Sequence, residues 1–170
     1  MKGAGKYSID PLEDFYKVHP VLTELRDAET EYLGGMGEDL PFEACYFDFV
    51  IIDNVIDHCQ SPWAVLDEIR RVLKPQGFLY FTVNLHTRFG CFVRFFIELL
   101  KLDRGHPFTF SLGKTRSFLE EKGFTILDEE IEDYRAARRK NISSKKMKRV
   151  MKGLVGAAEF EYMAVCRRIG

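Results

Sequence analysis

The side chains best suited to chemistry gather just after a buried apolar run, at positions 53–59. His58 is the natural general base among them, because an imidazole titrates near working pH. Asp53, Asp57 and Cys59 stand beside it and could suggest a metal site, but their spacing matches no familiar ligand pattern. A structural role for Asp57 and His58 at the entry to a helix fits the sequence equally well. We therefore expect no metal site and assign no catalytic residue, with His58 kept as a candidate.

These residues lie inside a strand, helix and strand pattern. Phe47–Ile52 is a short apolar run rich in β-branched residues, which is typical of a strand buried on both faces. Ser61 is a helix N-cap candidate with Pro62 at the first helical position, and apolar residues follow at helical spacing. Lys74–Gly77 predicts a tight turn, and Phe78–Val83 predicts a second strand. Such a βαβ unit closes with a right-handed crossover onto a parallel sheet.

Further elements are expected on both sides of this unit. Upstream, residues 7–9 and 31–33 are expected as short strands, joined by a helical connection over 12–25 that Pro20 weakens. Downstream, the expected elements are a helix around 92–100, a loop over 106–110, a helix that Ser111 caps and Gly123 ends, and strands over 124–127 and 160–166.

Length, composition and net charge limit the class of protein. The chain has 170 residues, is 46% hydrophobic and 30% charged, and carries a net charge of -1, which predicts a single domain over residues 1–170. Its four cysteines form no C-x-x-C pair, so a reduced cytoplasmic setting is the default expectation. The most apolar segment, 91–100, carries Arg94 and Glu98 and is too short to span a bilayer.

Charge separates sharply before the last strand. An acidic cluster at 128–133 is followed by nine Lys or Arg and no acid from Arg135 to Lys152, so residues 134–152 are interpreted as a basic insertion between the last two strands. Such a block could hold an anionic substrate, a phosphate backbone or an acidic lipid surface. A solvated and mobile insertion is the favoured interpretation. No aromatic residue interrupts Arg135–Lys152, which argues against nucleic-acid binding.

The motifs around the central unit follow one family pattern. Gly35–Phe42, Phe47-Asp48, Asn54–His58, Pro62 and Leu66–Gly77 together closely resemble the class I S-adenosylmethionine-dependent methyltransferases, in particular their small-molecule group. The resemblance implies an α/β, Rossmann-like fold, with a mostly parallel sheet, helices on both faces and an antiparallel C-terminal strand. It also implies S-adenosylmethionine as cofactor, S-adenosylhomocysteine as product and a small molecule as methyl acceptor.

The same resemblance implies where the adenosine part of the cofactor lies. Asp10, followed by Pro11, would end the family's second strand and hydrogen-bond the ribose, although an Asp before Pro is also a common turn residue. Met36, Gly37 and Glu38 would lie against the adenine. Met36 stands where many relatives carry an aspartate, so backbone groups or apolar packing would have to replace that acceptor.

The reacting centre is expected at the ends of the next two strands. Asn54 and Val55 would border the cofactor, because open α/β sheets bind ligands at the carboxyl ends of their strands. His58, Asn84 and His86 are expected on the acceptor side.

The family's first strand and its G-x-G-x-G loop have no counterpart here, so the resemblance predicts a chain truncated before the second strand. The absent strand is the central one of the family's sheet, and 49–52 would therefore lack a hydrogen-bonded neighbour. Either strand 7–9 pairs directly with 49–52, or another copy or another chain covers the exposed edges. We predict a homo-oligomer. A noncatalytic binding or assembly module, or a fragment, stays open as the alternative to an active methyltransferase.

Overall fold

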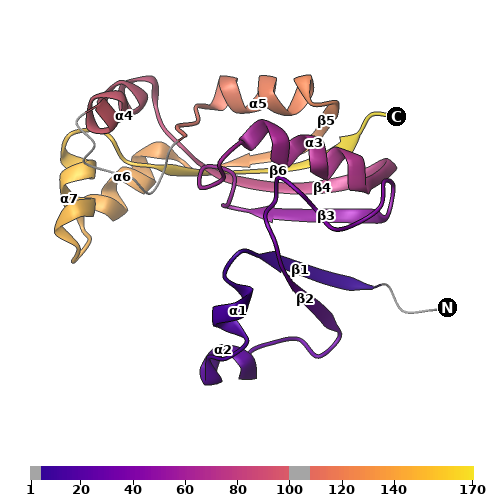
Figure 1. Ribbon diagram of the computed structural model, residues 1–170. Helices are drawn as coiled ribbons and strands as arrows, with labels where there is room; N and C mark the ends of the chain where they lie inside the picture. Colours follow the sequence, from indigo (N-terminus) through magenta and orange to yellow (C-terminus); the bar gives the residue numbers. More distant parts are fainter. Residues whose placement is uncertain (1–4, 100–107) are drawn as a thin grey trace.

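The computed structural model of the protein describes residues 5–99 and 108–170 (Figure 1). It is an α/β fold whose strands form a two-stranded sheet, β1-β2, and a four-stranded sheet in the order β3-β4-β6-β5. Strands β1 and β2 are parallel, as are β3 and β4, while β6 is antiparallel to both of its neighbours. The expected α/β fold with an antiparallel C-terminal strand is confirmed, but the four-stranded sheet is mixed rather than mostly parallel. The elements in chain order are β1 (Lys6–Asp10), α1 (Glu13–Tyr16), α2 (Pro20–Glu24), β2 (Thr30–Gly34), β3 (Phe47–Asp53), α3 (Pro62–Val72), β4 (Leu73–Leu85), α4 (Arg88–Leu99), α5 (Leu112–Glu121), β5 (Phe124–Ile131), α6 (Tyr134–Ile142), α7 (Met147–Leu154) and β6 (Phe160–Arg168).

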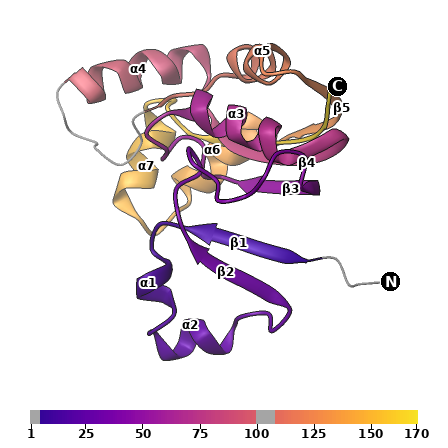
Figure 2. The ribbon, with the colours of Figure 1, turned by 45° about the vertical axis from the view of Figure 1, so that its right-hand side comes forward.

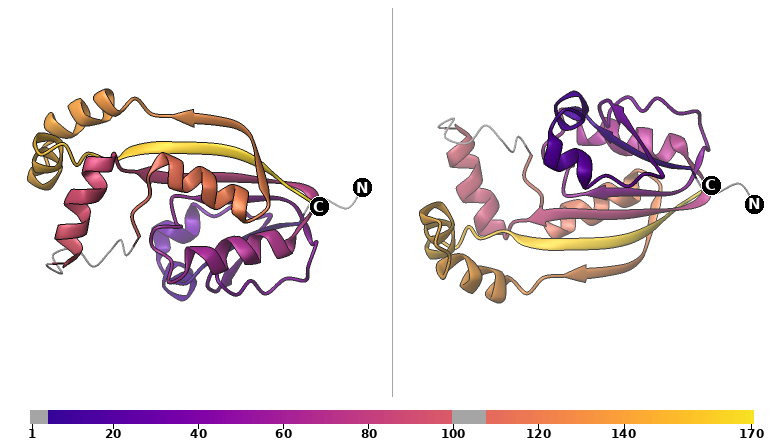
Figure 3. Two further views of the ribbon diagram at one scale, coloured as in Figure 1. Left: turned by 90° about the horizontal axis from the view of Figure 1, so that it is seen from above. Right: turned by 90° about the horizontal axis from the view of Figure 1, so that it is seen from below.

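The hydrophobic core lies between the four-stranded sheet and helices α3 and α5. Figure 3 shows both helices in front of the strands when the molecule is seen from above. Leu79, Phe81 and Val83 alternate along β4 and are fully buried against this layer. Helix α3 begins as its sequence predicts, because Ser61 Oγ accepts a hydrogen bond from Ala64 N at 3.3 Å.

The entry to β4 differs from its prediction. Lys74–Gly77, expected as a tight turn, forms an irregular start of β4, because Phe47 of β3 already pairs with Leu73 before the ladder shifts. Gln76 adopts a left-handed φ of 64° there. A Cβ on Gly77 would lie 2.9 Å from Lys74 O and 3.1 Å from Asp48 O, so this position requires glycine.

The starts and ends of the other helices largely follow the sequence signals. The helical connection after β1 breaks at Pro20 into α1 and α2, as its sequence predicts. Gly123 ends α5 with a φ of 78°, as expected. Ser111 occupies the N-cap position of α5, but its side chain makes no capping hydrogen bond. Part of the expected loop at 106–110 lies outside the described residues.

Of the two alternatives for the edge of 49–52, direct pairing with residues 7–9 is not formed. Strand β1 pairs with β2 only, and β3 pairs with β4 only, so β3 is an edge of its sheet among the described residues. Tyr7 of β1 instead packs edge-on against Phe47 of β3, with ring centroids 5.7 Å apart, and Phe42 and Tyr46 complete this aromatic cluster. Side chains, rather than backbone hydrogen bonds, therefore join the two sheets here. Figure 2 shows the strands β1 and β2 set apart from the four-stranded sheet.

The face of the four-stranded sheet opposite α3 and α5 keeps apolar side chains exposed. Phe49 pairs in register with Phe78, and both are exposed, as is Ile51. Two-sided burial, which the apolar run at Phe47–Ile52 predicted, is not realised in β3, where only Ile52 is fully buried.

The basic insertion folds as two helices, α6 and α7, at one end of the molecule (Figure 1). Arg138 of α6 donates to Gly153 O of α7 at 2.8 Å and fixes the pair. Among the residues that the structure describes, no helix is long and apolar enough to cross a membrane.

Candidate cofactor site

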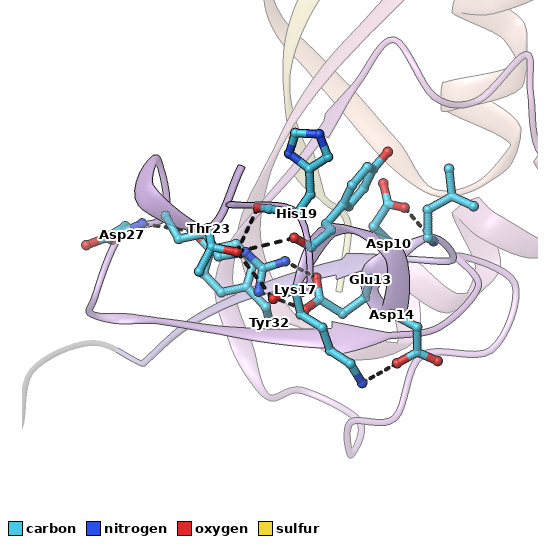
Figure 4. A network of polar contacts seen from close by, with 11 residues as sticks. Asp10, Glu13, Asp14, Lys17, His19, Thr23, Asp27 and Tyr32 are labelled. Atoms are coloured by element: carbon cyan, nitrogen blue, oxygen red, sulfur yellow. Dashed lines mark hydrogen bonds and ion pairs between the residues drawn. The ribbon is translucent and has the colours of Figure 1, made fainter. Parts of the chain in front are cut away.

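The carboxyl end of β1 carries a carboxylate beside the loop that follows β2. Asp10 pairs in register with Gly34, and Gly35 N donates to Asp10 O at 3.4 Å. The side-chain Oδ1 of Asp10 accepts from Leu12 N at 2.7 Å, which makes Asp10 a turn residue as well (Figure 4). A carboxylate can accept about four hydrogen bonds, so this turn leaves Asp10 able to accept more.

The loop after β2 is held against the start of α3 by Glu38. Glu38 Oε1 accepts from Gln60 N at 2.7 Å and from Ser61 N at 3.1 Å, directly before the first residue of α3. A negative charge at a helix N-terminus is stabilised by the exposed amides and the helix dipole. A Cβ on Gly37 would lie 3.3 Å from Val65 Cγ2, so this part of the loop packs directly on α3. One Glu38 oxygen therefore positions the loop.

A second clamp on the same loop was missed by the sequence analysis. Arg71 of α3 donates to Phe42 O at 2.6 Å and to Leu40 O at 2.9 Å. Glu68, one helical turn earlier, binds the Arg71 guanidinium through both oxygens at 2.7 Å and accepts from Leu40 N at 2.9 Å. The Arg71 guanidinium lowers the pKa of the Glu68 carboxyl. The i, i+3 spacing of Glu68 and Arg71 predicts that these two side chains pair on the helix. It does not indicate their loop partners, which lie about 30 residues away in the chain.

The carboxyl ends of β3 and β4 meet at a second group of polar side chains. Asn54 ends β3 with a left-handed φ of 51°, a conformation that Asn tolerates better than most residues. Its backbone N lies 2.8 Å from Thr82 Oγ1, and Thr82 Oγ1 in turn donates to Asp53 Oδ1 at 2.5 Å. Asn84 Nδ2 donates to Asn54 Oδ1 at 2.7 Å. The expected residues Asn54 and Asn84 thus contact each other, with Val55 exposed beside them.

The two candidate histidines lie in different surroundings. His58 is 44% exposed, and its Nε2 is 3.9 Å from Asp57 Oδ1. His86 is buried, with Nε2 3.8 Å from Oε1 of Glu159. The same Glu159 oxygen accepts from Lys152 at 2.5 Å. These distances make both carboxylates electrostatic neighbours of the imidazoles rather than hydrogen-bond partners through Nε2.

Two cavities open beside the end of β4. His86 lines one of about 360 Å³, together with Arg88, Lys114 and Phe160. Asn84 lines another of about 430 Å³, which extends to the basic residues of α6 and α7. Cavities of this size are within the range that holds small organic ligands.

The residues present fit the adenosine half of S-adenosylmethionine. Asp10 offers carboxylate acceptors for ribose hydroxyls, and Met36 offers a partly exposed apolar surface beside the Gly37 backbone. Glu38 has one oxygen committed to the α3 terminus. In the described part of the chain, no strand pairs with the edge of β3 that faces β1.

The fold is a Rossmann-like α/β architecture. Residues 5–81 match the family model described as "Methyltransferase domain". A solved structure of a candidate methyltransferase from Bacillus halodurans is 21% identical and superposes with a TM-score of 0.67, covering 96% of this chain and 83% of that one. An S-adenosylmethionine-dependent methyltransferase from Methanosarcina mazei is 15% identical, with a TM-score of 0.61 and coverage of 96% and 81%.

One curated relative also matches in sequence. It is an uncharacterized protein of Methanocaldococcus jannaschii, 44% identical over 41 residues, which are 24% of this chain. The match spans only 20% of that relative's length. The family model over residues 5–81 and the shared fold agree with the resemblance to the class I S-adenosylmethionine-dependent methyltransferases.

Proposed function

We propose that the chain binds S-adenosylmethionine at the carboxyl ends of β1, β2 and β3 and serves methyl transfer to a small-molecule acceptor. The observation that carries this proposal is the Asp10 carboxylate, which ends β1 beside the clamped loop Gly34–Phe42. The match of residues 5–81 to a methyltransferase family model supports it. Bound cofactor would supply an already activated methyl group, so the protein's contribution is mainly to align donor and acceptor.

Each expected site residue has a role in this proposal. Asp10 accepts from the ribose hydroxyls, Pro11 shapes the turn, and Met36 and Gly37 pack on the adenine. Glu38 fixes that loop on α3. Asn54 and Val55 would border the cofactor at the end of β3. His58, Asn84 and His86 would lie on the acceptor side.

The test is calorimetric titration with S-adenosylmethionine and S-adenosylhomocysteine. Asp10→Asn keeps an oxygen for Leu12 N but removes the charge, so it separates ribose binding from turn formation. Hydrogen bonds to charged groups contribute about 1.5–3 kcal/mol, so we expect Asp10→Asn to weaken binding by about 10- to 100-fold. Asp14→Asn is the matched control, since Asp14 is exposed and pairs only with Lys17 in the contacts the structure gives. Absence of saturable binding at millimolar ligand would contradict the proposal.

A second candidate function is a noncatalytic methyltransferase-like module for binding or assembly. The free edge of β3 and the exposed Phe49, Ile51 and Phe78 favour it, because unpaired strand edges and apolar sheet faces promote association. We propose that a second copy of the chain covers this face. Self-association without any cofactor binding would favour the module over the enzyme.

A further inference from the structure

Helix α7 has an apolar face that stays exposed among the residues the structure describes. Met147, Met151, Leu154 and Val155 form the α7 apolar stripe, and 47–76% of each residue is exposed. Their spacing of four, three and one residues places them on one side of the helix. A different side of α7 packs on α6. Gly153 lies on that side, and because it has no side chain the two helices approach closely at Ile142. The stripe is therefore not the face that holds α7 in place.

The apolar surface continues from α7 onto α4. Phe89 and Phe92 of α4 are 57% and 59% exposed. A Cβ on Gly156, just after α7, would lie 3.6 Å from Phe89 Cδ1, so the start of α4 packs against the end of α7. Figure 1 shows α4 and α7 at the same end of the molecule. Both helices thus carry exposed apolar side chains at this end of the molecule.

Positive charge borders this surface. Residues 135–152 carry nine Lys or Arg and no acid. At 100° per residue, Lys148 and Lys152 follow one border of the α7 apolar stripe, and Lys152 also pairs with Glu159. The N-cap Lys146 and Arg149 lie on the polar side, where they line the cavity beside Asn84. The hydrogen bonds from Arg138 of α6 to the end of α7 hold the two helices together.

An exposed apolar stripe with Lys and Arg on the polar face matches the requirements of an anionic lipid surface. Such a helix lies in the plane of the interface, with apolar side chains among the acyl chains and cations near the headgroups. A nucleic acid would use the charges but not the stripe. We infer that the α7 apolar stripe, together with Phe89 and Phe92, docks the protein peripherally on membranes that contain anionic lipid.

The experiment is vesicle flotation at low and high salt, with phosphatidylcholine alone and with phosphatidylcholine containing 30% phosphatidylglycerol. We expect binding at least tenfold stronger to the anionic vesicles, because the negative surface potential attracts each Lys or Arg that lies near the membrane. Met151→Ser with Leu154→Ser should abolish most of this binding. Val18→Ser with Val21→Ser is the matched control, since both valines are equally exposed but lie near α1 and α2.

Charge is tested separately. Lys146→Glu with Arg149→Glu should remove the preference for anionic vesicles, whereas Arg167→Glu on β6 should leave it intact. Equal binding to both vesicle types, or no binding at low salt, would overturn the inference. Unchanged binding of the Met151→Ser, Leu154→Ser protein would overturn it too, as would self-association in solution that this variant removes. None of these outcomes depends on cofactor binding.

Discussion

At the scale of single residues, two carboxylates of the candidate cofactor site have different structural roles. Asp10 forms a turn with one oxygen and keeps acceptor capacity at the end of β1. Glu38 uses one oxygen to bind two backbone amides before α3. Sequence resemblance placed both at the cofactor, but it could not separate ligand binding from loop positioning, because the Gln60 and Ser61 amides come near Glu38 only in the folded chain.

Cys59 gives a prediction on reactivity. Burial, followed by the nearby Glu38 and Asp57 carboxylates, raises the pKa of the Cys59 thiol to about 11. Since the thiolate is the reactive form, alkylation of Cys59 by iodoacetamide at pH 8 should be roughly a hundredfold slower than that of an ordinary exposed thiol. Peptide mass spectrometry measures the rate, with the exposed Cys45 as internal reference. Equal rates at the two cysteines in the folded protein would contradict the predicted environment.

Glu68 gives a prediction on pH. Its lowered pKa means that the ionised form is stabilised in the folded state, so the contribution is complete above the ordinary carboxyl pKa and is lost as pH falls through the folded-state value. Glu68→Gln should therefore lower the free energy of unfolding by about 1–2 kcal/mol at pH 7. The difference from the unmodified protein should shrink below about pH 4.

Denaturant unfolding at pH 7 and at acidic pH checks this expectation. Asp67→Asn on the same helix is the control, since Asp67 is largely exposed and its pair with Lys122 should contribute at most about 1 kcal/mol. A Glu68→Gln effect that stays constant down to acidic pH would count against the Arg71 clamp.

At the scale of elements, α3 organises the site, since Glu38, Gly37 and Arg71 all tie the loop after β2 to it. The helix itself was predictable, because Ser61, Pro62 and the apolar spacing are local signals. The clamp was not, because its partners are distant in sequence. The irregular start of β4 was also missed, since proline and glycine indicate a turn whether or not a neighbouring strand extends past it.

Gly77 tests the geometry of that irregular start. Gly77→Ala would bring a Cβ within 3.1 Å of two backbone oxygens, so it should cost about 1–3 kcal/mol of stability. Gly113→Ala in α5 meets nothing within 4 Å and should be neutral or stabilising by about 0.5–1 kcal/mol. Thermal unfolding of both variants gives the comparison. A stable Gly77→Ala protein would mean that the strand entry is not constrained as described.

At the scale of the whole molecule, two sheets meet through the aromatic cluster around Tyr7, and β3 keeps a free edge. The family pattern predicted that one edge of β3 lacks a neighbouring strand. It did not predict how the two sheets contact each other. Backbone pairing between β1 and β3 was one of two expectations. Instead, the rings of Tyr7 and Phe47 pack between the two sheets. A single domain over 1–170 stays a prediction.

The exposed sheet face predicts self-association. The chain should sediment as a dimer or larger species at tens of micromolar, and Ile51→Lys should shift it to monomer, because Ile51 is 61% exposed in the middle of the apolar face. Val18→Lys, at a similarly exposed position outside that face, should leave the distribution unchanged. A monomer at the highest accessible concentration would contradict the proposed homo-oligomer.

Cofactor binding at the carboxyl ends of β1, β2 and β3 is tested most directly by hydrogen–deuterium exchange with and without saturating S-adenosylhomocysteine. The account predicts slower exchange in peptides that contain Asp10–Leu12, Gly34–Glu38 and Asn54-Val55, and unchanged exchange in α6 and α7. Saturation by the ligand without protection at these strand ends would contradict it.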